Sequence, residues 1–213
     1  MNITILSSSE NHPINDTLKS WIDRNLCNHQ IHLVRSTSDL VGGDILFLIS
    51  CSEVIDYDAR AKFKKALVIH ASDLPKGRGW SPHIWEILNG AKYITVSLLE
   101  ADDKVDSGDI WKKVRVNIPG TAMWQEINQL IFETELALMD FAIENMLEIV
   151  PYKQSIEMPS YWPKRKPEDS EIDISKSIEQ QFNLLRVSDN ARYPTFFYKN
   201  GKKFKLTMES VNE

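Results

Sequence analysis

The chain of 213 residues contains little cysteine, glycine or proline. Its two cysteines, Cys27 and Cys51, provide neither a disulfide framework nor a zinc-binding quartet, which favours a reducing compartment. Eight glycines and nine prolines exclude a collagen-like or low-complexity chain. These absences are typical of an ordinary globular protein.

The sequence also lacks recognisable targeting segments. Its first residues, MNITILSSSENHP, contain no basic region and no long apolar run, so we expect no secretory signal. No stretch approaches the roughly 18 apolar residues that a membrane-spanning helix requires. We therefore expect a soluble, cytoplasmic protein with no membrane partner.

Acidic side chains are in slight excess. Thirty Asp and Glu against 25 Lys and Arg give a formal net charge of −5. Because nucleic-acid binding depends on cations that neutralise phosphates, this balance disfavours a nucleic-acid partner, although it leaves room for a local basic patch. The length and a hydrophobic content of 42% are sufficient for one sizeable domain.

Apolar runs alternate with helical patterns through the first 150 residues. Strands are predicted at 2–6, 30–34, 44–49, 66–69, 93–100 and 110–118. Helices are predicted from Asn15 or Asp16, over 57–65, from Ser81-Pro82 to Asn89-Gly90, and within 120–147. The alternation predicts an α/β fold with an open, mainly parallel, Rossmann-like sheet.

The composition changes at Pro151. Prolines among charged residues predict an extended surface segment, followed by a helix over 175–187 and a hairpin at Asn200-Gly201. We therefore predict a main domain at 1–150 and a small C-terminal extension at 151–213.

Two polar loops follow predicted buried strands, and ligands of open α/β sheets bind beyond the carboxyl ends of strands. One loop begins at His70, and the other is the acidic segment around Asp106. If their strands are neighbours, the two side chains can share a crevice, where the carboxylate would orient the imidazole as a general base requires. The alternative is a strand-end histidine bonded to a backbone carbonyl, beside a solvated acidic turn.

Other patterns give weaker indications. The acidic loop lacks the ligand spacing of a calcium site, so no metal is expected. Cys51 suits a small buried residue better than a nucleophile. Lys76 and Arg78 could hold an anion or form a solvated basic turn. No partner can be named for His12, His29, His32 and His83.

Several of these residues occur in an order that is typical of a known family. They are the segments 68–75 (VIHASDLP), 78–79 (RG), 87–90 (ILNG) and 106–109 (DSGD), with Pro82 and Trp85. These residues resemble the formyltransferases that use N10-formyltetrahydrofolate, whose hallmark is Asn-x-His-x-Ser-x-Leu-Pro followed by Asp-(Thr/Ala/Ser)-Gly. Asp106 follows His70 by 36 positions, which matches that pattern without gaps.

The segments 162–173, 182–186 and 193–196 resemble the region after the catalytic domain in family members that act on nucleotide-linked amino sugars. The transfer-RNA enzymes continue into a β-barrel domain, for which we expect no residues here. The resemblance therefore implies formyl transfer to the amine of a nucleotide-linked amino sugar, as in bacterial surface polysaccharide (O-antigen) biosynthesis. It also makes 1–150 the catalytic domain and suggests a homodimer formed through the C-terminal helix and hairpin.

The resemblance further implies roles for individual residues. His70 and Asp106 would be catalytic. The loop that walls the pterin of the folate would contain Ser50, Cys51, Ser52 and Ile55, and the backbone that reads its polar edge would be that of Asp103, Lys104 and Val105. The acceptor would lie along Lys76, Arg78, Trp80, Trp85 and Arg165.

One position departs from the family pattern. The Asn that precedes the His by two residues falls on Val68, which cannot donate a hydrogen bond. In the family this amide helps to hold the oxyanion, and loss of one such donor costs about 2.7–4 kcal/mol. A backbone N–H, Ser72 or a side chain of the 50–52 loop could replace it. The alternatives are a folate- or nucleotide-sugar-binding protein without transfer, a formyltetrahydrofolate hydrolase, or a transfer-RNA or glycinamide ribonucleotide formyltransferase.

Overall fold

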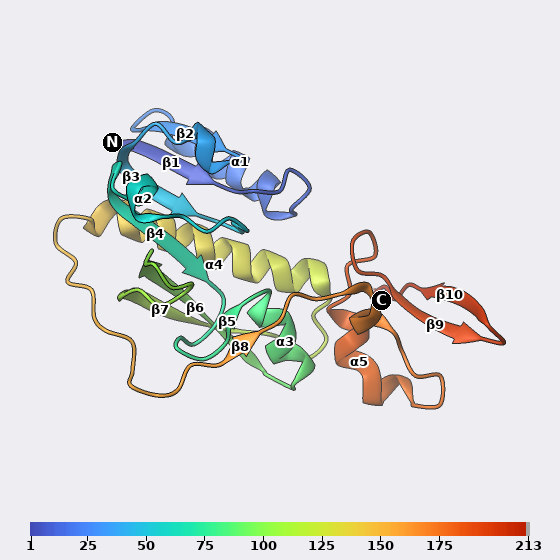
Figure 1. The fold of residues 1–213 in the computed structure, drawn as a ribbon. Coiled ribbons are helices and arrows are strands. Elements are labelled where there is room, and N and C mark those ends of the chain that lie inside the picture. Colours follow the sequence, from blue (N-terminus) through green and yellow to red (C-terminus); the bar gives the residue numbers. More distant parts are fainter. Residues whose placement is uncertain (212–213) are drawn as a thin grey trace.

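An open six-stranded sheet forms the framework of the protein (Figure 1). The computed structural model describes residues 1–211. The strands lie in the order β2-β1-β3-β4-β6-β7. Their bounds are β1 (Asn2–Leu6), β2 (Gln30–Val34), β3 (Gly43–Leu48), β4 (Phe63–His70), β6 (Tyr93–Glu100) and β7 (Ile110–Asn117).

The sheet is parallel in one part and antiparallel in the other. β1 pairs in parallel with β2 and with β3, and β3 pairs in parallel with β4. β6 runs antiparallel to both of its neighbours, β4 and β7. The prediction of an α/β fold with an open, mainly parallel sheet is therefore confirmed.

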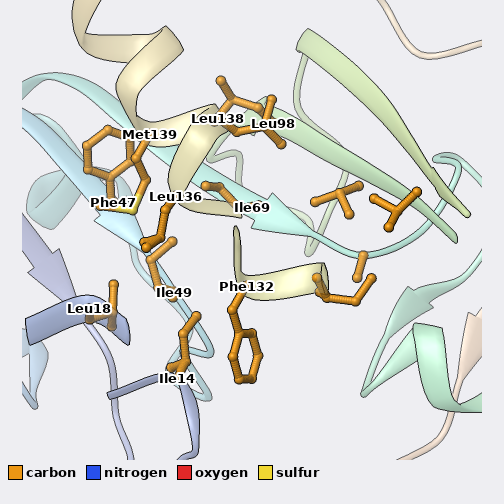
Figure 2. Close-up of a cluster of buried hydrophobic side chains, with 14 of the residues drawn as sticks. Ile14, Leu18, Phe47, Ile49, Ile69, Leu98, Phe132, Leu136, Leu138 and Met139 are labelled. Carbon is orange, nitrogen blue, oxygen red and sulfur yellow. The ribbon is translucent and has the colours of Figure 1, made fainter. Parts of the chain in front are cut away.

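One face of the sheet is covered by α1 (Ile14–Asn25) and α4 (Trp124–Asn145), which pack on it side by side. Nε1 of Trp21 in α1 donates to Asp140 in α4 at 2.7 Å. Figure 2 shows the core between these helices and the strands, with side chains from α1, α4, β4, β6 and the region of β3. No helix within the described residues is long and apolar enough to cross a membrane.

The opposite face has a thinner cover. The short helix α2 (Tyr57–Arg60) and the loops around it cover a second apolar cluster, which includes Leu46, Leu48 and Ile55. Because side chains alternate along a strand, β4 contributes to both faces. Leu67 and Ile69 belong to the core under α4, whereas Val68 lies in the second cluster and His70 follows it on the same side.

Two helix predictions were wrong in detail. The segment predicted as one helix over 57–65 is helical only in α2, and β4 already begins at Phe63, where it pairs with Gly43. Pairing with β3 overrides the local helix preference of this lysine-rich stretch. The first helix begins at Ile14 after Pro13, because the Asn15 amide instead donates to three carbonyls of the preceding loop, at 2.9 Å each.

The remaining elements follow the sequence expectation, with small shifts at their ends. They are α3 (Pro82–Leu88), α5 (Ile178–Arg186) and the hairpin of β9 (Thr195–Lys199) and β10 (Lys202–Leu206). Two short 3₁₀ turns, at Thr37–Asp39 and Pro167–Ser170, were not predicted. α5 and the hairpin stand to one side of the sheet, and an extended segment connects them to α4 (Figure 1).

The extended segment after residue 150 is hydrogen-bonded to the main part of the protein. Tyr152 pairs with Ile110 at the start of β7. Further along, β8 (Tyr161–Trp162) pairs in parallel with β5 (Arg78–Gly79), a two-residue pairing that the sequence did not indicate. The division at residue 150 stays a prediction, and the segment beyond it lies against the loops that carry the candidate site.

Candidate active site

His70 and Asp106 meet on the face of the sheet opposite α4. Nδ1 of His70 lies 3.6 Å from Oδ1 of Asp106, and the two side chains are only 9% and 7% exposed. Oδ2 of Asp106 accepts a hydrogen bond from the backbone N–H of Gly79 at 2.9 Å. The carboxylate is thus buried and held from two sides.

The two loops meet in a way that differs from the sequence argument. Their strands are neighbours, as required, but His70 pairs with Ser97 and Leu67 pairs with Glu100, so the carboxyl end of β6 lies away from His70. The connection from β6 to β7 therefore returns toward His70. Gly108 lies directly against the Glu100 carbonyl, where a Cβ would have no space, so this close approach requires glycine.

The second ring nitrogen of His70 is also engaged. Nε2 lies 2.8 Å from the carbonyl oxygen of Gly77. Because a carbonyl can only accept, Nε2 carries a proton in this arrangement. The alternative of a histidine bonded to a backbone carbonyl therefore describes half of the observed geometry. The other half, a solvated acidic turn, applies to residues 102–105, which are exposed, but not to the Asp106 side chain, which is buried.

The loop predicted to wall the folate lies on the same face. Ser50 has a left-handed backbone with φ +47°, and the N–H of Ser52 donates to Oγ of Ser8 at 3.0 Å. Burial raises the pKa of the Cys51 thiol. Cys51 and Ile55 pack in the same apolar cluster as Val68, so the family's Asn position lies on the wall of this region.

The residues predicted to read the pterin edge lie beside this wall. Arg60 joins the two loops, since it donates to the Ile55 carbonyl at 2.6 Å and pairs with Asp103. Within the described residues, the backbone N–H groups of Lys104 and Val105 have no acceptor. An apolar wall beside free backbone donors fits a flat heteroaromatic ring with a polar edge. Among the described residues, no cluster of His, Cys, Asp or Glu is arranged to hold a metal.

The residues predicted to bind the acceptor fall into two groups, of which the first is accessible. Lys76 is exposed and pairs with Glu157 at 2.7 Å. Trp80 is 41% exposed, with the Lys164 ammonium 4.7 Å from the centre of its ring. Trp85 stacks on Trp162 with ring centres 5.9 Å apart.

The second group is buried. Arg78 donates to Oε1 of Gln154 at 2.6 Å, and Arg165 donates to Oγ of Ser170 at 3.0 Å. Both arginines are less than 10% exposed. The structure thus brings Trp80 and Trp85 together with residues 162–164. It commits Nη1 and Nη2 of Arg78 to contacts inside the protein, while the buried Nε has no partner among the described residues.

Two further polar side chains, Glu86 and Gln154, were missed by the sequence argument, and a third, His83, was named there without a partner. Burial, followed by the nearby Asp73, raises the pKa of Glu86 to about 7, and its Oε1 faces Gly77. Burial lowers the pKa of His83 to about 3, with His12 and nearby arginines contributing. Gln154 contacts the backbone of Asp106. The only sequence signal for Glu86 and His83 is their position just after the loop that begins at His70. A lone Gln in a proline-rich segment gives no signal.

Comparison with known proteins identifies the fold and the family. The family model described as "Formyl transferase" matches residues 9–143. Methionyl-tRNA formyltransferase from Natranaerobius thermophilus is 34% identical over 158 residues, which are 70% of this chain and 48% of that protein. The chain spans about half the length of the curated relatives it matches.

Solved structures give the same fold over the whole chain. Methionyl-tRNA formyltransferase from Clostridium thermocellum matches with a TM-score of 0.82 and 24% identity, covering 100% of this chain and 94% of that one. A sugar N-formyltransferase from Shewanella sp. matches with a TM-score of 0.73 and 14% identity, covering 100% and 99%. At these identities the likeness supports the fold alone, and it includes the extension after residue 150.

Proposed function

The chain belongs to the formyl transferase family, and on this premise we propose that it transfers a formyl group from N10-formyltetrahydrofolate to the amine of a nucleotide-linked amino sugar. The buried contact between His70 and Asp106 carries this proposal. It places an imidazole and a carboxylate together on the face of the sheet that also holds the apolar wall of Cys51 and Ile55.

The reaction requires attack of a neutral amine on the formyl carbon and a proton to travel from the amine to the departing nitrogen. N10-formyltetrahydrofolate, when bound, supplies that carbon and that nitrogen. Asp106 holds the His70 ring by its Nδ1 side, so that Nε2 faces the reacting groups. Nε2 would then donate to the formyl oxygen as negative charge develops there, in place of its present hydrogen bond to the Gly77 carbonyl. Asp106 would accept the proton of the attacking amine and pass it to the departing folate nitrogen, which leaves the carboxylate ionised again.

A donor is needed to replace the amide that Val68 lacks. Among the candidates, Ser72 has the strongest support. Its hydroxyl is fully buried and has no hydrogen-bond partner among the described residues, and it follows His70 by two positions. A buried hydroxyl without a partner is costly, so a hydrogen bond from this hydroxyl to a substrate oxygen would be favourable.

The amino-sugar acceptor is supported by the tail and by charge. Trp80 and Trp85 lie beside residues 162–164, where the sequence resembles the sugar enzymes. The net charge of −5 disfavours a nucleic acid. Methionyl-tRNA is the second candidate acceptor, because the curated relatives are methionyl-tRNA formyltransferases.

The test measures tetrahydrofolate release with a panel of acceptors. The panel contains dTDP-, UDP-, GDP- and CMP-linked amino sugars, methionyl-tRNA and glycinamide ribonucleotide, with a reaction lacking acceptor as the baseline. We expect release with one class of nucleotide-linked amino sugar. Release without any acceptor would instead identify a hydrolase, and binding of folate without any release would identify a binding protein. Light scattering of the same sample tests the expected homodimer.

A further inference from the structure

One glutamine from the segment after residue 150 contacts both loops of the candidate site. Nε2 of Gln154 donates to the carbonyl of Asp106 at 2.8 Å and to the carbonyl of Gly108 at 2.9 Å. Its Oε1 accepts a hydrogen bond from Nη2 of Arg78 at 2.6 Å. Both protons of the amide and its oxygen are therefore used where the two loops come together.

The contact with Asp106 supports an unfavourable backbone conformation. Asp106 has φ +53°, in the left-handed region, which is uncommon for a non-glycine residue and persists where the surroundings enforce it. The carbonyls of Asp106 and Gly108 flank the turn, and one NH₂ group binds both. This turn aims the Asp106 carboxylate at His70 and at the N–H of Gly79.

The contact with Arg78 extends the same clamp to the loop that follows β4. Arg78 also reaches the hydroxyl of Tyr161 at 3.3 Å, and the next residue, Gly79, donates to Asp106. Gly79 has φ +97°, and a Cβ there would lie 2.6 Å from the Trp162 carbonyl. The contacts therefore form a closed circle: Gln154 binds Arg78, the adjoining Gly79 binds Asp106, and Asp106 binds Gln154.

The backbone on both sides of Gln154 is fixed. Two backbone hydrogen bonds join Tyr152 to Ile110, at 2.7 and 2.9 Å. Beyond Gln154, the carbonyl and the hydroxyl of Ser160 accept from the backbone N–H groups of Arg78 and Gly77, each at 2.9 Å. The side chain of Gln154 is thus presented to the site from a segment anchored at both ends.

We propose that Gln154 is a positioning residue, which holds Asp106 against His70 by clamping the turn at 106–108 to the loop at 77–79. Arg78 acts in this clamp through its Nη1 and Nη2 atoms. The effect on turnover rests on the proposed function, whereas the effect on the geometry of the loops does not. The segment after residue 150 is then part of the catalytic unit, and the predicted boundary at 150 does not separate two functions.

The test compares Gln154→Met with the control Lys153→Met. Methionine keeps the length of the side chain and removes all three hydrogen bonds. Lys153 also joins the tail to the loop after β6, but through an exposed ion pair with Asp109 at 3.0 Å, a type of contact that contributes little. Gln154→Glu is the second variant, since a carboxylate keeps the bond to Arg78 and cannot donate to the two carbonyls.

The first readout is amide hydrogen exchange at Gly79, whose N–H is held by the Asp106 carboxylate. We expect exchange at least about tenfold faster in Gln154→Met and Gln154→Glu, and unchanged exchange in Lys153→Met. The second readout is steady-state kinetics. We expect kcat to fall about 10–100-fold while KM changes little, because misplacement of a catalytic group by about 1 Å has effects of this size.

Faster exchange at Gly79 together with a lower kcat supports the proposal. Unchanged exchange in both Gln154 variants, or an unchanged kcat in an enzyme that is active, overturns it. A wild-type protein that transfers formyl to no acceptor overturns the proposed function, and the exchange rates then still decide whether Gln154 holds the two loops.

Discussion

On one face of the sheet, Leu67 and Ile69 of β4 pack under α4 in a continuous apolar core, whereas on the other face Val68 and His70 of the same strand lie under loops. The first face is closed by two long helices whose contact is completed by Trp21 and Asp140. The second is closed by short helical turns and by connections that meet through hydrogen bonds. Alternate residues of one strand therefore serve different ends: those under α4 stabilise the fold, and those under the loops form the candidate site.

The largest expected effect belongs to the loop-covered face. His70→Asn removes the only imidazole in contact with Asp106 among the described residues, and loss of general acid–base catalysis lowers rates by about 10²–10⁴-fold. We expect turnover to fall by this factor while the midpoint of thermal unfolding changes by only a few degrees. Asp106→Asn, assayed alongside, should behave similarly. Near-normal turnover in either variant would contradict the assigned roles.

The next effect belongs to the helix-covered face. Leu67→Ala creates a cavity at a fully buried position, and such changes cost about 2–5 kcal/mol of unfolding free energy. Denaturant unfolding measures the loss. We expect kcat per folded molecule to stay within about twofold of normal. A stable Leu67→Ala protein with impaired turnover would break the division between the two faces.

A smaller effect comes from an acidic group on the helix-covered side. Glu135 in α4 is 8% exposed, and burial raises its pKa to about 8 from 4.5. Between these values the folded protein binds a proton that the unfolded chain has released, so the group favours folding below about pH 4.5 and this contribution is lost as pH rises through about 8. The slope is about 1.4 kcal/mol per pH unit within the window.

Glu135→Gln should remove that slope. We expect the unfolding free energy of the wild type to fall relative to the variant between pH 6 and 7, as measured by urea unfolding at both values. Equal pH dependence in the two proteins would show that the Glu135 carboxyl reaches water or a partner. Glu133, which lines an open surface depression on the same helix, provides the matched control as Glu133→Gln.

The sequence predicts the helix-covered face better than the loop-covered one. Apolar patterns locate five of the six strands of the sheet almost to the residue and α4 within 120–147, because burial against a sheet selects them directly. The pair of His70 and Asp106 could be predicted from the loops in which they lie. The direction of β6 could not be predicted, because the apolar pattern of a buried strand is the same for parallel and antiparallel pairing. The clamp of Gln154 could not be predicted either. It depends on a contact with a backbone carbonyl 48 positions away, and every residue has such a carbonyl, so the sequence gives no signal for it.

The smallest effect concerns the reaction rates of the two cysteine thiols. Cys51 probes the loop-covered face, and Cys27 serves as the exposed reference. Cys27 is exposed after α1, whereas Cys51 lies in the wall next to Ile55, where burial raises the pKa of its thiol. Because the thiolate is the reactive form, we expect Cys51 in a Cys27→Ser protein to react with a disulfide reagent at pH 8 about tenfold more slowly than Cys27 in a Cys51→Ser protein. If this wall holds the pterin, 5-formyltetrahydrofolate should slow Cys51 further and leave Cys27 unchanged. Equal slowing of both cysteines would mean that the ligand stabilises the protein generally, and no slowing of Cys51 would place the folate elsewhere than against the 50–55 loop.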